Sequence, residues 1–314
     1  MRDRKSKFNQ LLKTYPSPLK EYLQFIPQKS GMLGAEQCMT VMETMGISHE
    51  DLILKLLPVA KLFAATPISH FPVGAVAKAR VSDVSGEFTL FLGANIEFPG
   101  LALTQTIHAE QATVMNAWLQ GAMQIDAIAV SAVPCGLCRQ FLFEIEGSRT
   151  LDVIVQRTDA DGSTTARLHD LLPQAFGPHD LGLQGGLISS AGHLPNLSLK
   201  TFSDDPLVRE ALSAAERSYA PYTHNFAGCT IQVGNEKIYA GRYVENAAFN
   251  PSLSPLHTAI IRLNLDGLAP HGKITRAILV EKPTTISQRG ISEFLLGSLA
   301  PDARLEYFEA EDEY

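Results

Sequence analysis

The chain has 314 residues, of which 45% are hydrophobic and 19% are charged, and its formal net charge at pH 7 is −7. This is an ordinary globular composition with room for two hydrophobic cores, and no apolar run approaches the ~20 residues of a transmembrane helix. No run of Lys and Arg stands out, so the basic face of a nucleic-acid binder is missing, and we expect neither nucleic acid nor membrane among the partners.

Residues 1–47 are expected to form a small helical segment in which prolines separate short helices. Its start is charged and lacks the apolar core of a signal peptide, so we expect a cytoplasmic protein. The next unit is expected over residues 48–177. It begins with a helix whose N-cap is Ser48, with Asp51 three residues later as in a capping box. Two strand-like runs follow and indicate a hairpin: FPVGAVAKARV and EFTLFLGANIE.

The rest of this unit alternates helices and strands. A predicted helix over residues 107–121 precedes the apolar strand AIAVSAV, the turn PCGLC, the helix RQFLFEIEG and the strand LDVIVQRT. Alternation of this kind over about a hundred residues indicates an α/β domain built in layers.

A stretch rich in Gly, Ser, Pro and Leu over residues 178–203 is the predicted linker, and the pattern restarts over residues 204–314. The first helix after the linker has an acidic start that carries a proline. The restart is an internal repeat. Pro67, Ser69, His70 and Gly74 match Pro221, Thr223, His224 and Gly228 at an offset of 154, Gly93 and Glu97 match Gly241 and Glu245 at 148, and residues 127–130 match 277–280 at 150. We therefore predict a duplicated fold.

Cysteine usage favours a reducing compartment. Of four cysteines, Cys135 and Cys138 have CxxC spacing, whereas Cys38 and Cys229 stand alone in apolar surroundings. A metal or redox pair fits this pattern better than a disulfide framework. We expect Cys38 and Cys229 to be buried as small apolar residues.

One imidazole and two thiols are candidate metal ligands: His108, Cys135 and Cys138. These ligand types suit tetrahedral zinc. The cysteines lie three residues apart at a helix start, where the helix dipole favours thiolates, and His108 opens the preceding helix. Three ligands leave one position for a water, whose pKa zinc lowers toward ~7. Glu110 is not needed as a ligand, and we predict that it carries protons.

Each part of this constellation also has a plainer interpretation. A CxxC motif occurs as a redox pair, a histidine in an apolar helix is usually a core residue, and a glutamate at a helix start often only complements the helix dipole. A redox pair does not require the upstream His-x-Glu, so the combination favours a catalytic zinc. In the second copy, Leu256-His257-Thr258-Ala259 replaces the stretch around His108 and no cysteine pair follows. We expect that copy to bind no zinc.

The pattern H-x-E…P-C-x-x-C is that of zinc deaminases. The chain resembles the cytidine deaminases of the long, two-domain bacterial form over nearly its whole length. The stretches that carry the resemblance are SHFPVGA, GANIEF, HAEQ, PCGLCRQ, LLPQAFGP and YVENAAFNP. The resemblance implies a three-layer α/β/α fold with a mixed sheet, present as a catalytic domain and a degenerate copy. It also implies one Zn²⁺ per subunit and a homodimer with active sites at the subunit interface.

The implied reaction is hydrolysis of cytidine and 2′-deoxycytidine to uridine and 2′-deoxyuridine with release of ammonia, a pyrimidine salvage step. In the family a zinc-activated hydroxide attacks C4 and a glutamate, here Glu110, shuttles the protons. Asn95 and Glu97 match the pair that binds the ribose hydroxyls, and a carboxylate there would repel a 5′-phosphate. Phe71 matches the aromatic that packs on the base. Phe176 resembles a second ring contact from the partner subunit, although its stretch equally fits an interface plug.

Two other functions stay open at this point. A nucleic-acid-editing deaminase would use the same zinc chemistry but requires a basic groove, which the net charge of −7 and the Asn95–Glu97 pair disfavour. A zinc-stapled scaffold without activity would tolerate the loss of Glu110, because that residue is not a ligand.

Overall fold

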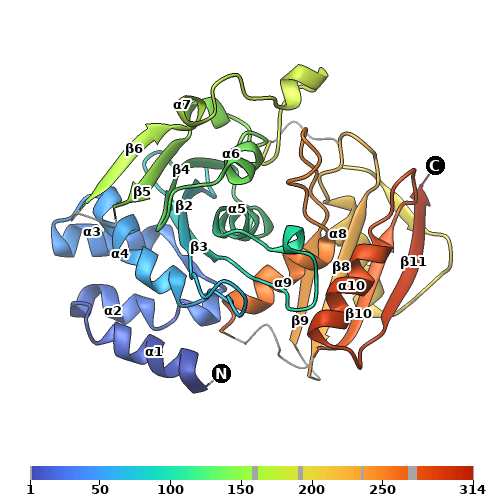
Figure 1. Cartoon of the computed structure of the whole chain (residues 1–314), viewed down its shortest axis with the longest axis horizontal. Coiled ribbons are helices and arrows are strands. Elements are labelled where there is room, and N and C mark those ends of the chain that lie inside the picture. The colour runs from blue at the N-terminus through green and yellow to red at the C-terminus, as the bar shows by residue number, and fades with distance from the viewer. Residues whose placement is uncertain (1, 158–161, 190–193, 235–236, 268–273, 314) are drawn as a thin grey trace.

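The computed structural model describes residues 2–157, 162–189, 194–234, 237–267 and 274–313. Each half of the chain forms its own sheet, and the two sheets stand on either side of a pair of central helices, α5 (Ala109–Leu119) and α9 (Pro255–Leu265) (Figure 1). The strand orders are β1-β3-β2-β4-β5-β6 and β7-β11-β10-β8-β9. The predicted duplicated α/β fold with mixed sheets is confirmed.

The first sheet is antiparallel except for one pair of strands. Its strands are β1 (Met32–Leu33), β2 (Gly74–Arg80), β3 (Thr89–Ala94), β4 (Gln124–Val130), β5 (Asp152–Gln156) and β6 (Ser163–Arg167), of which β4 and β5 run parallel. The predicted hairpin is β2–β3. Strand β3 is buried along its whole length, because helices cover both faces of the sheet.

Helix α4 (His49–Lys61) covers one face of this sheet and α5 covers the other, which gives three layers (Figure 1). The predicted capping box starts α4: Asp51 N–H donates to Ser48 Oγ and Ser48 N–H donates to an Asp51 carboxylate oxygen, both at 3.1 Å. The helices α6 (Gly136–Leu142) and α7 (Leu168–Leu171) complete this half. Single-turn 3-10 helices occur at Pro27–Lys29, Leu103–Gln105, Ser148–Thr150 and Pro178–Leu181.

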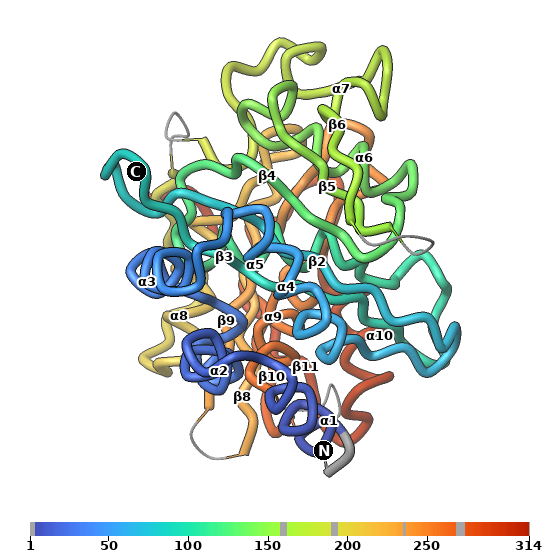
Figure 2. The backbone as a smooth tube through the Cα atoms, turned by 90° about the vertical axis from the view of Figure 1, so that its left-hand side faces the viewer, coloured from blue at the N-terminus to red at the C-terminus, as the bar shows by residue number. Residues whose placement is uncertain are grey.

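The N-terminal segment carries the helices α1 (Arg2–Leu12), α2 (Ser17–Leu23) and α3 (Ala35–Met45), which lie on the outer side of the first half (Figure 2). It is not helical throughout, because β1 pairs with the edge of β3 and extends the sheet. The Arg4 side chain connects the halves: it donates to the Phe63 carbonyl at 3.2 Å and to Asn264 Oδ1 at 3.1 Å. Among the described helices, none has the length and apolarity required to span a bilayer.

The second half repeats the layers. Its strands are β7 (Leu197–Leu199), β8 (Ala227–Val233), β9 (Lys237–Arg242), β10 (Ile274–Glu281) and β11 (Leu305–Asp312), and its helices are α8 (Pro206–Glu216), α9 and α10 (Arg289–Leu299). Helix α8 starts as predicted, with Asp205 as N-cap and Pro206 as first residue. Strand β7 lies inside the stretch predicted as linker and pairs with β11, so the end of that stretch belongs to the sheet. Residues 190–193 of the same stretch lie outside the described residues.

The internal repeat is visible in atomic contacts. A Cβ on Gly93 would lie 2.2 Å from the backbone N of Thr113 in α5, and one on Gly241 would lie 2.1 Å from the backbone O of Pro255 in α9. Each sheet therefore needs a glycine where its central helix crosses. Glu97 and Glu245 also make equivalent hydrogen bonds: the first accepts from the N–H groups of Ile68 and Ser69 and the Ser69 hydroxyl, and the second from the N–H groups of Tyr222 and Thr223 and the Thr223 hydroxyl.

Candidate metal centre and active site

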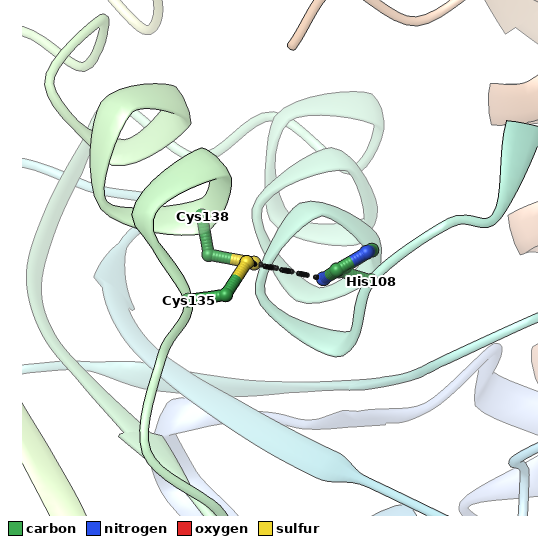
Figure 3. Close-up of side chains that lie close together, drawn as sticks. All are labelled: His108, Cys135 and Cys138. Atoms are coloured by element: carbon green, nitrogen blue, oxygen red, sulfur yellow. Dashed lines mark hydrogen bonds between the residues drawn. The ribbon is translucent and has the colours of Figure 1, made fainter. Parts of the chain in front are cut away.

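Two helix starts bring the three predicted ligands together. His108 is the N-cap of α5 and Cys135 is the N-cap of α6, with Cys138 one turn further along α6. Their side chains point toward one another (Figure 3). His108 Nδ1 lies 3.2 Å from Cys138 Sγ and 3.6 Å from Cys135 Sγ, and the two sulfurs are 3.6 Å apart. Among the described residues, no other group of His, Cys, Asp and Glu ligand atoms is gathered in this way.

These distances are close to those of a tetrahedral metal site. With Zn–S bonds of about 2.3 Å and a Zn–N bond of about 2.1 Å, tetrahedral ligand atoms lie about 3.5–3.8 Å from each other. The two distances of 3.6 Å lie in this range, and the His108 Nδ1–Cys138 Sγ distance of 3.2 Å is shorter than it. The sulfur–sulfur distance of 3.6 Å is far too long for a disulfide, and both cysteines are free. His108 faces the sulfurs through Nδ1, so this is the ring nitrogen that would bind a metal. The donor set therefore fits Zn²⁺.

The two thiols differ in their surroundings. The hydrogen bond with Cys138 lowers the pKa of Cys135 to about 5, and the N–H groups at the start of α6 act in the same direction, against partial burial. Cys138 is fully buried, and its pKa is raised by the thiolate beside it and by burial. The exposed member of the pair is thus a ready thiolate, which is the form that binds a metal. Cys38 and Cys229 are buried and free, as predicted.

Glu110 lies at the second position of α5, two residues after His108, and only 4% of it is exposed. Burial raises its pKa above the usual value, while its own N–H and the Cys138 thiol act in the opposite direction. A carboxyl group in such a place both accepts and releases protons closer to neutral pH than a carboxyl in water.

A cavity of about 280 Å³ opens beside these groups. Its lining includes most of the predicted site residues: Phe71, Asn95, Glu97, His108, Glu110 and Cys135. Cys138 is fully buried and does not line the cavity. The structure thus brings together, around one hollow, residues that lie up to 64 positions apart in the chain, from Phe71 to Cys135.

Asn95 and Glu97 hold the segment that carries Phe71. Asn95 accepts from Val73 N–H at 2.9 Å and donates to the Phe71 carbonyl at 3.0 Å. Burial acts to raise the pKa of Glu97, but hydrogen bonds from Ser69 and Ile68 outweigh it, and the pKa lies below its usual value. Glu97 is therefore a carboxylate in the cavity wall at neutral pH.

The two aromatic residues have different positions. The Phe71 side chain lines the cavity and the residue is 61% exposed. Phe176 is 43% exposed, follows α7 and does not line this cavity. Its carbonyl accepts a hydrogen bond from Gln140 of α6 at 2.6 Å, which fixes its backbone next to the helix of the cysteines.

Ser69 lines the cavity and donates to Glu97, yet its type alone gave no reason to select it. The signal was present in the repeat, where Thr223 keeps the hydroxyl and bonds Glu245. Other cavity residues that the sequence did not indicate are Val73, Thr106, Ala109, Ala132 and Val133, which are apolar or small and carry no chemical signature.

The second copy requires one correction. His257 does not stand in the place of His108: the N-cap of α9 is Ser254, and His257 is its third residue, the position that Gln111 has in α5. His257 is buried, and burial lowers its pKa to about 4. Its Nδ1 faces Ser254 Oγ at 2.9 Å and its Nε2 faces the Gln105 carbonyl at 3.2 Å. It is a neutral histidine of the core.

Comparisons with known proteins bear on both halves. A family profile described as "Cytidine and deoxycytidylate deaminase zinc-binding region" matches residues 47–154, and a second profile with the same description matches residues 168–293. The chain is 39% identical over 277 residues to a cytidine deaminase of Aliivibrio fischeri, which covers 88% of each chain. It is 43% identical over 258 residues to one of Yersinia pestis, covering 82% of each. Among solved structures, a cytidine deaminase from Burkholderia pseudomallei is 30% identical over 41% of this chain and 100% of that one, with a TM-score of 0.35.

Proposed function

The chain belongs to the cytidine deaminase family and deaminates cytidine with zinc as its cofactor, and from this premise we propose that His108, Cys135 and Cys138 hold one zinc ion per subunit. The observation that carries the proposal is the meeting of these three ligand atoms with buried Glu110 beside one cavity. When bound, the metal would supply a water acidified to a pKa of about 7.

Glu110 would carry the protons of the reaction. Its carboxyl group is desolvated and lies next to the ligand His108 in the cavity wall, so it is within reach of the attacking water and of a base held there. It would take one proton from the water and give it to N3 of cytosine, and it would then take the second proton from the hydroxyl on C4 and give it to the amine that leaves. The planar base does not yet make these interactions with Glu110, and it gains them as C4 becomes tetrahedral. Interactions that form only in the transition state lower the activation barrier of the reaction.

Asn95 and Glu97 would bind the sugar hydroxyls. A carboxylate has about four lone-pair sites, and Glu97 uses three of them on Ser69 and Ile68. One acceptor site therefore remains, and the Asn95 amide retains one donor and one acceptor site. This spare capacity suits ribose or deoxyribose hydroxyls, whereas the Glu97 charge would repel a 5′-phosphate. We include 2′-deoxycytidine as a substrate and pyrimidine salvage as the role.

Phe71 would pack on the base, and Phe176 would reach the site of a partner subunit in a homodimer. The support for the second role is that the Phe176 ring is partly exposed and lies outside the cavity of its own chain. Large apolar side chains are also exposed nearby: Val133, which lines the cavity, and Leu103, three residues before the lining residue Thr106, are 70% exposed each. A reducing cytoplasm as location agrees with a ligand pair of free thiols.

The test follows the loss of cytidine absorbance in the wild type and in Glu110→Gln. We expect the variant to retain zinc and to lose about 10²–10⁴-fold in turnover, because the amide cannot move protons. Helix α3 supplies a matched control: Glu36 stands in the same tripeptide Ala-Glu-Gln at the same helix position as Glu110, on the surface. Glu36→Gln should have full activity.

Full activity of Glu110→Gln would contradict the proposed mechanism and favour a zinc-stapled scaffold. A single-stranded oligonucleotide, offered beside free cytidine, tests the other function. Activity on the oligonucleotide alone would favour an editing deaminase.

A further inference from the structure

Three arginines converge on a second cavity, far from the zinc ligands. Arg217 at the end of α8, Arg242 at the end of β9 and Arg262 in α9 line a hollow of about 320 Å³, slightly larger than the catalytic cavity of about 280 Å³. Glu210 is the one acidic residue in its lining. We refer to this hollow as the arginine cavity. In a chain of net charge −7, a local excess of two positive charges is unexpected.

The positive charges of the arginine cavity are only partly matched by acidic residues of the protein. Arg262 Nη1 is buried, and among the described residues it has no hydrogen-bond partner. The charge of Asp266, the C-cap residue of α9, acts on Arg262, but Asp266 makes its hydrogen bonds elsewhere and accepts from Lys237 at 3.1 Å and from the Tyr239 hydroxyl at 2.9 Å. An unpaired, buried guanidinium nitrogen is costly, because the group has lost water without gaining an acceptor.

The guanidinium groups of Arg242 and Arg217 have few partners in the described part of the chain. The Arg242 guanidinium lies 5.3 Å from the ring centroid of Trp118, a cation–π contact, and the described part of the chain places no acceptor on it. Arg217 Nε donates to the Ser213 carbonyl at 3.1 Å, and its Nη2 reaches Glu210 at 3.8 Å, in a pair of which both side chains are more than 40% exposed. Exposed ion pairs of this kind contribute little to the stability of a protein. Burial and the charges of Arg217 and Arg262 lower the pKa of Arg242 to about 10, which is the mark of cations held together out of water.

We propose that the arginine cavity is a binding site for a phosphate group, separate from the deaminase site. Three guanidinium forks present planar, bidentate donors, which match the oxygens of phosphate better than a single carboxylate. A dianion would neutralise the excess of two charges in the lining and give the partly buried guanidinium groups of Arg242 and Arg262 an acceptor. The site goes beyond deamination of cytidine, since the catalytic cavity has the opposite character, with the carboxylates of Glu97 and Glu110 in its wall.

The two cavities share no lining residue. Leu119, which lines the arginine cavity, ends α5, and His108 precedes the start of the same 11-residue helix. An α-helix of this length measures about 16 Å, so a phosphate group in the arginine cavity would not contact the zinc ligands. The proposal therefore predicts binding and stabilisation, without substitution for the substrate.

The experiment measures binding to the full-length, zinc-loaded protein by calorimetry and thermal unfolding. The probes are inorganic phosphate, tripolyphosphate and ATP, each compared with chloride at equal ionic strength. We expect all three probes to bind and saturating probe to raise the unfolding temperature by about 2–5 °C. If ATP and tripolyphosphate bind equally, the phosphate chain alone is recognised. If ATP binds more tightly, the ligand is a nucleotide. Either order supports the site.

Variants locate the site. Arg217→Gln and Arg242→Gln should each weaken phosphate binding about tenfold or more, whereas Arg209→Gln, an equal charge change on the outer surface of α8, should not. Arg217 is exposed, so its substitution leaves the fold intact, and cytidine turnover in phosphate-free buffer confirms this. Three results would overturn the proposal. The first is an unfolding temperature that the probes raise no more than chloride does. The others are phosphate binding that is unchanged in both cavity variants, or an equal loss of binding in Arg209→Gln.

Discussion

The two halves of the chain have the same layers but different residues at the helix starts where the first half has its proposed zinc ligands. In the first half, the start of the central helix α5 carries His108, and α6 begins at Cys135. In the second half the central helix α9 begins at Ser254, and α10 begins at Gln288. The scaffold is thus compatible with a metal site at these helix starts but does not require one.

The second half fills the start of α10 with a polar network. Glu281 is fully buried and accepts hydrogen bonds from the N–H of Gln288 at 2.8 Å, from Tyr307 at 2.9 Å and from Ser287 at 2.5 Å. Asn225 bridges to both Glu281 and Gln288. A carboxylate with this many donors is stable inside a protein without any ion. The second half thus holds the start of α10 through hydrogen bonds to a buried carboxyl group, at the place where the first half has the proposed zinc ligands of α6.

The two halves should differ most when the N-cap residue of each central helix is replaced by alanine. His108→Ala should lose the zinc and at least about a thousandfold in cytidine turnover, since the residue is a proposed ligand. Ser254→Ala removes a cap that accepts from His257 N–H and should cost about 1 kcal/mol of stability with unchanged turnover. Zinc content, kcat and urea unfolding are measured for both variants. Zinc retained by His108→Ala would exclude it as a ligand.

Both halves share the close approach of a sheet glycine to the central helix, and substitution of these glycines tests it. Gly93→Ala and Gly241→Ala would place a Cβ 2.2 Å and 2.1 Å from helix backbone atoms, respectively. Each should destabilise the protein by about 3 kcal/mol in urea unfolding, because the helix must move away. Gly297→Ala in α10 meets no atom within 4 Å and is the control, expected to be neutral or stabilising. Tolerance at only one of the two glycines would show that the copies pack differently.

His108, Cys135 and Cys138 could be proposed as a ligand set from the sequence, because zinc needs few residue types at fixed spacing, and the structure brings their ligand atoms within 4.8 Å of one another. It also predicted the layers and the capped helices α4 and α8, whose signals are local. The strands β1 and β7 were not predicted, because two or three residues form a strand only through the partner strand that they meet. The place of His257 was wrong because the alignment matched residue types, whereas helix starts set the true equivalence.

Glu144 illustrates what sequence alone cannot reveal. Within RQFLFEIEG it resembles an exposed helix residue, yet it is fully buried. Its partners lie far along the chain in the second half: it accepts from Tyr219 at 2.7 Å, from Tyr222 at 2.5 Å and from Ala247 N–H at 2.8 Å. Only the packing of the two halves against each other buries Glu144 and supplies its hydrogen-bond donors.

Glu144 therefore tests whether the second half supports the first. Glu144→Gln replaces one acceptor oxygen by a donor and should cost about 2 kcal/mol of stability, because buried donors lose their partner. It should also raise KM several-fold with little change in kcat, since Ala247 neighbours Asn246, which bonds Gln140 of α6 at 3.2 Å. Tyr219→Phe, which removes one donor, is the milder control. A wild-type KM in Glu144→Gln would show that the second half does not support the active site of the first.

The smallest effect concerns Glu97, whose contacts Glu245 repeats in the second half. The folded-state pKa of Glu97 lies below its usual value, so its carboxylate adds stability above a pH of about 4.5, and this stability is lost as pH falls through the folded-state pKa. Urea unfolding of chelator-treated protein between about pH 3 and 6 measures it without a contribution from zinc. Glu97→Gln should flatten that part of the pH curve and raise KM for cytidine. Glu245→Gln loses the equivalent hydrogen bonds and should lower stability at neutral pH with KM unchanged. An equal rise of KM in both variants would mean that Glu97 acts through the fold alone, as Glu245 does, and not through the sugar.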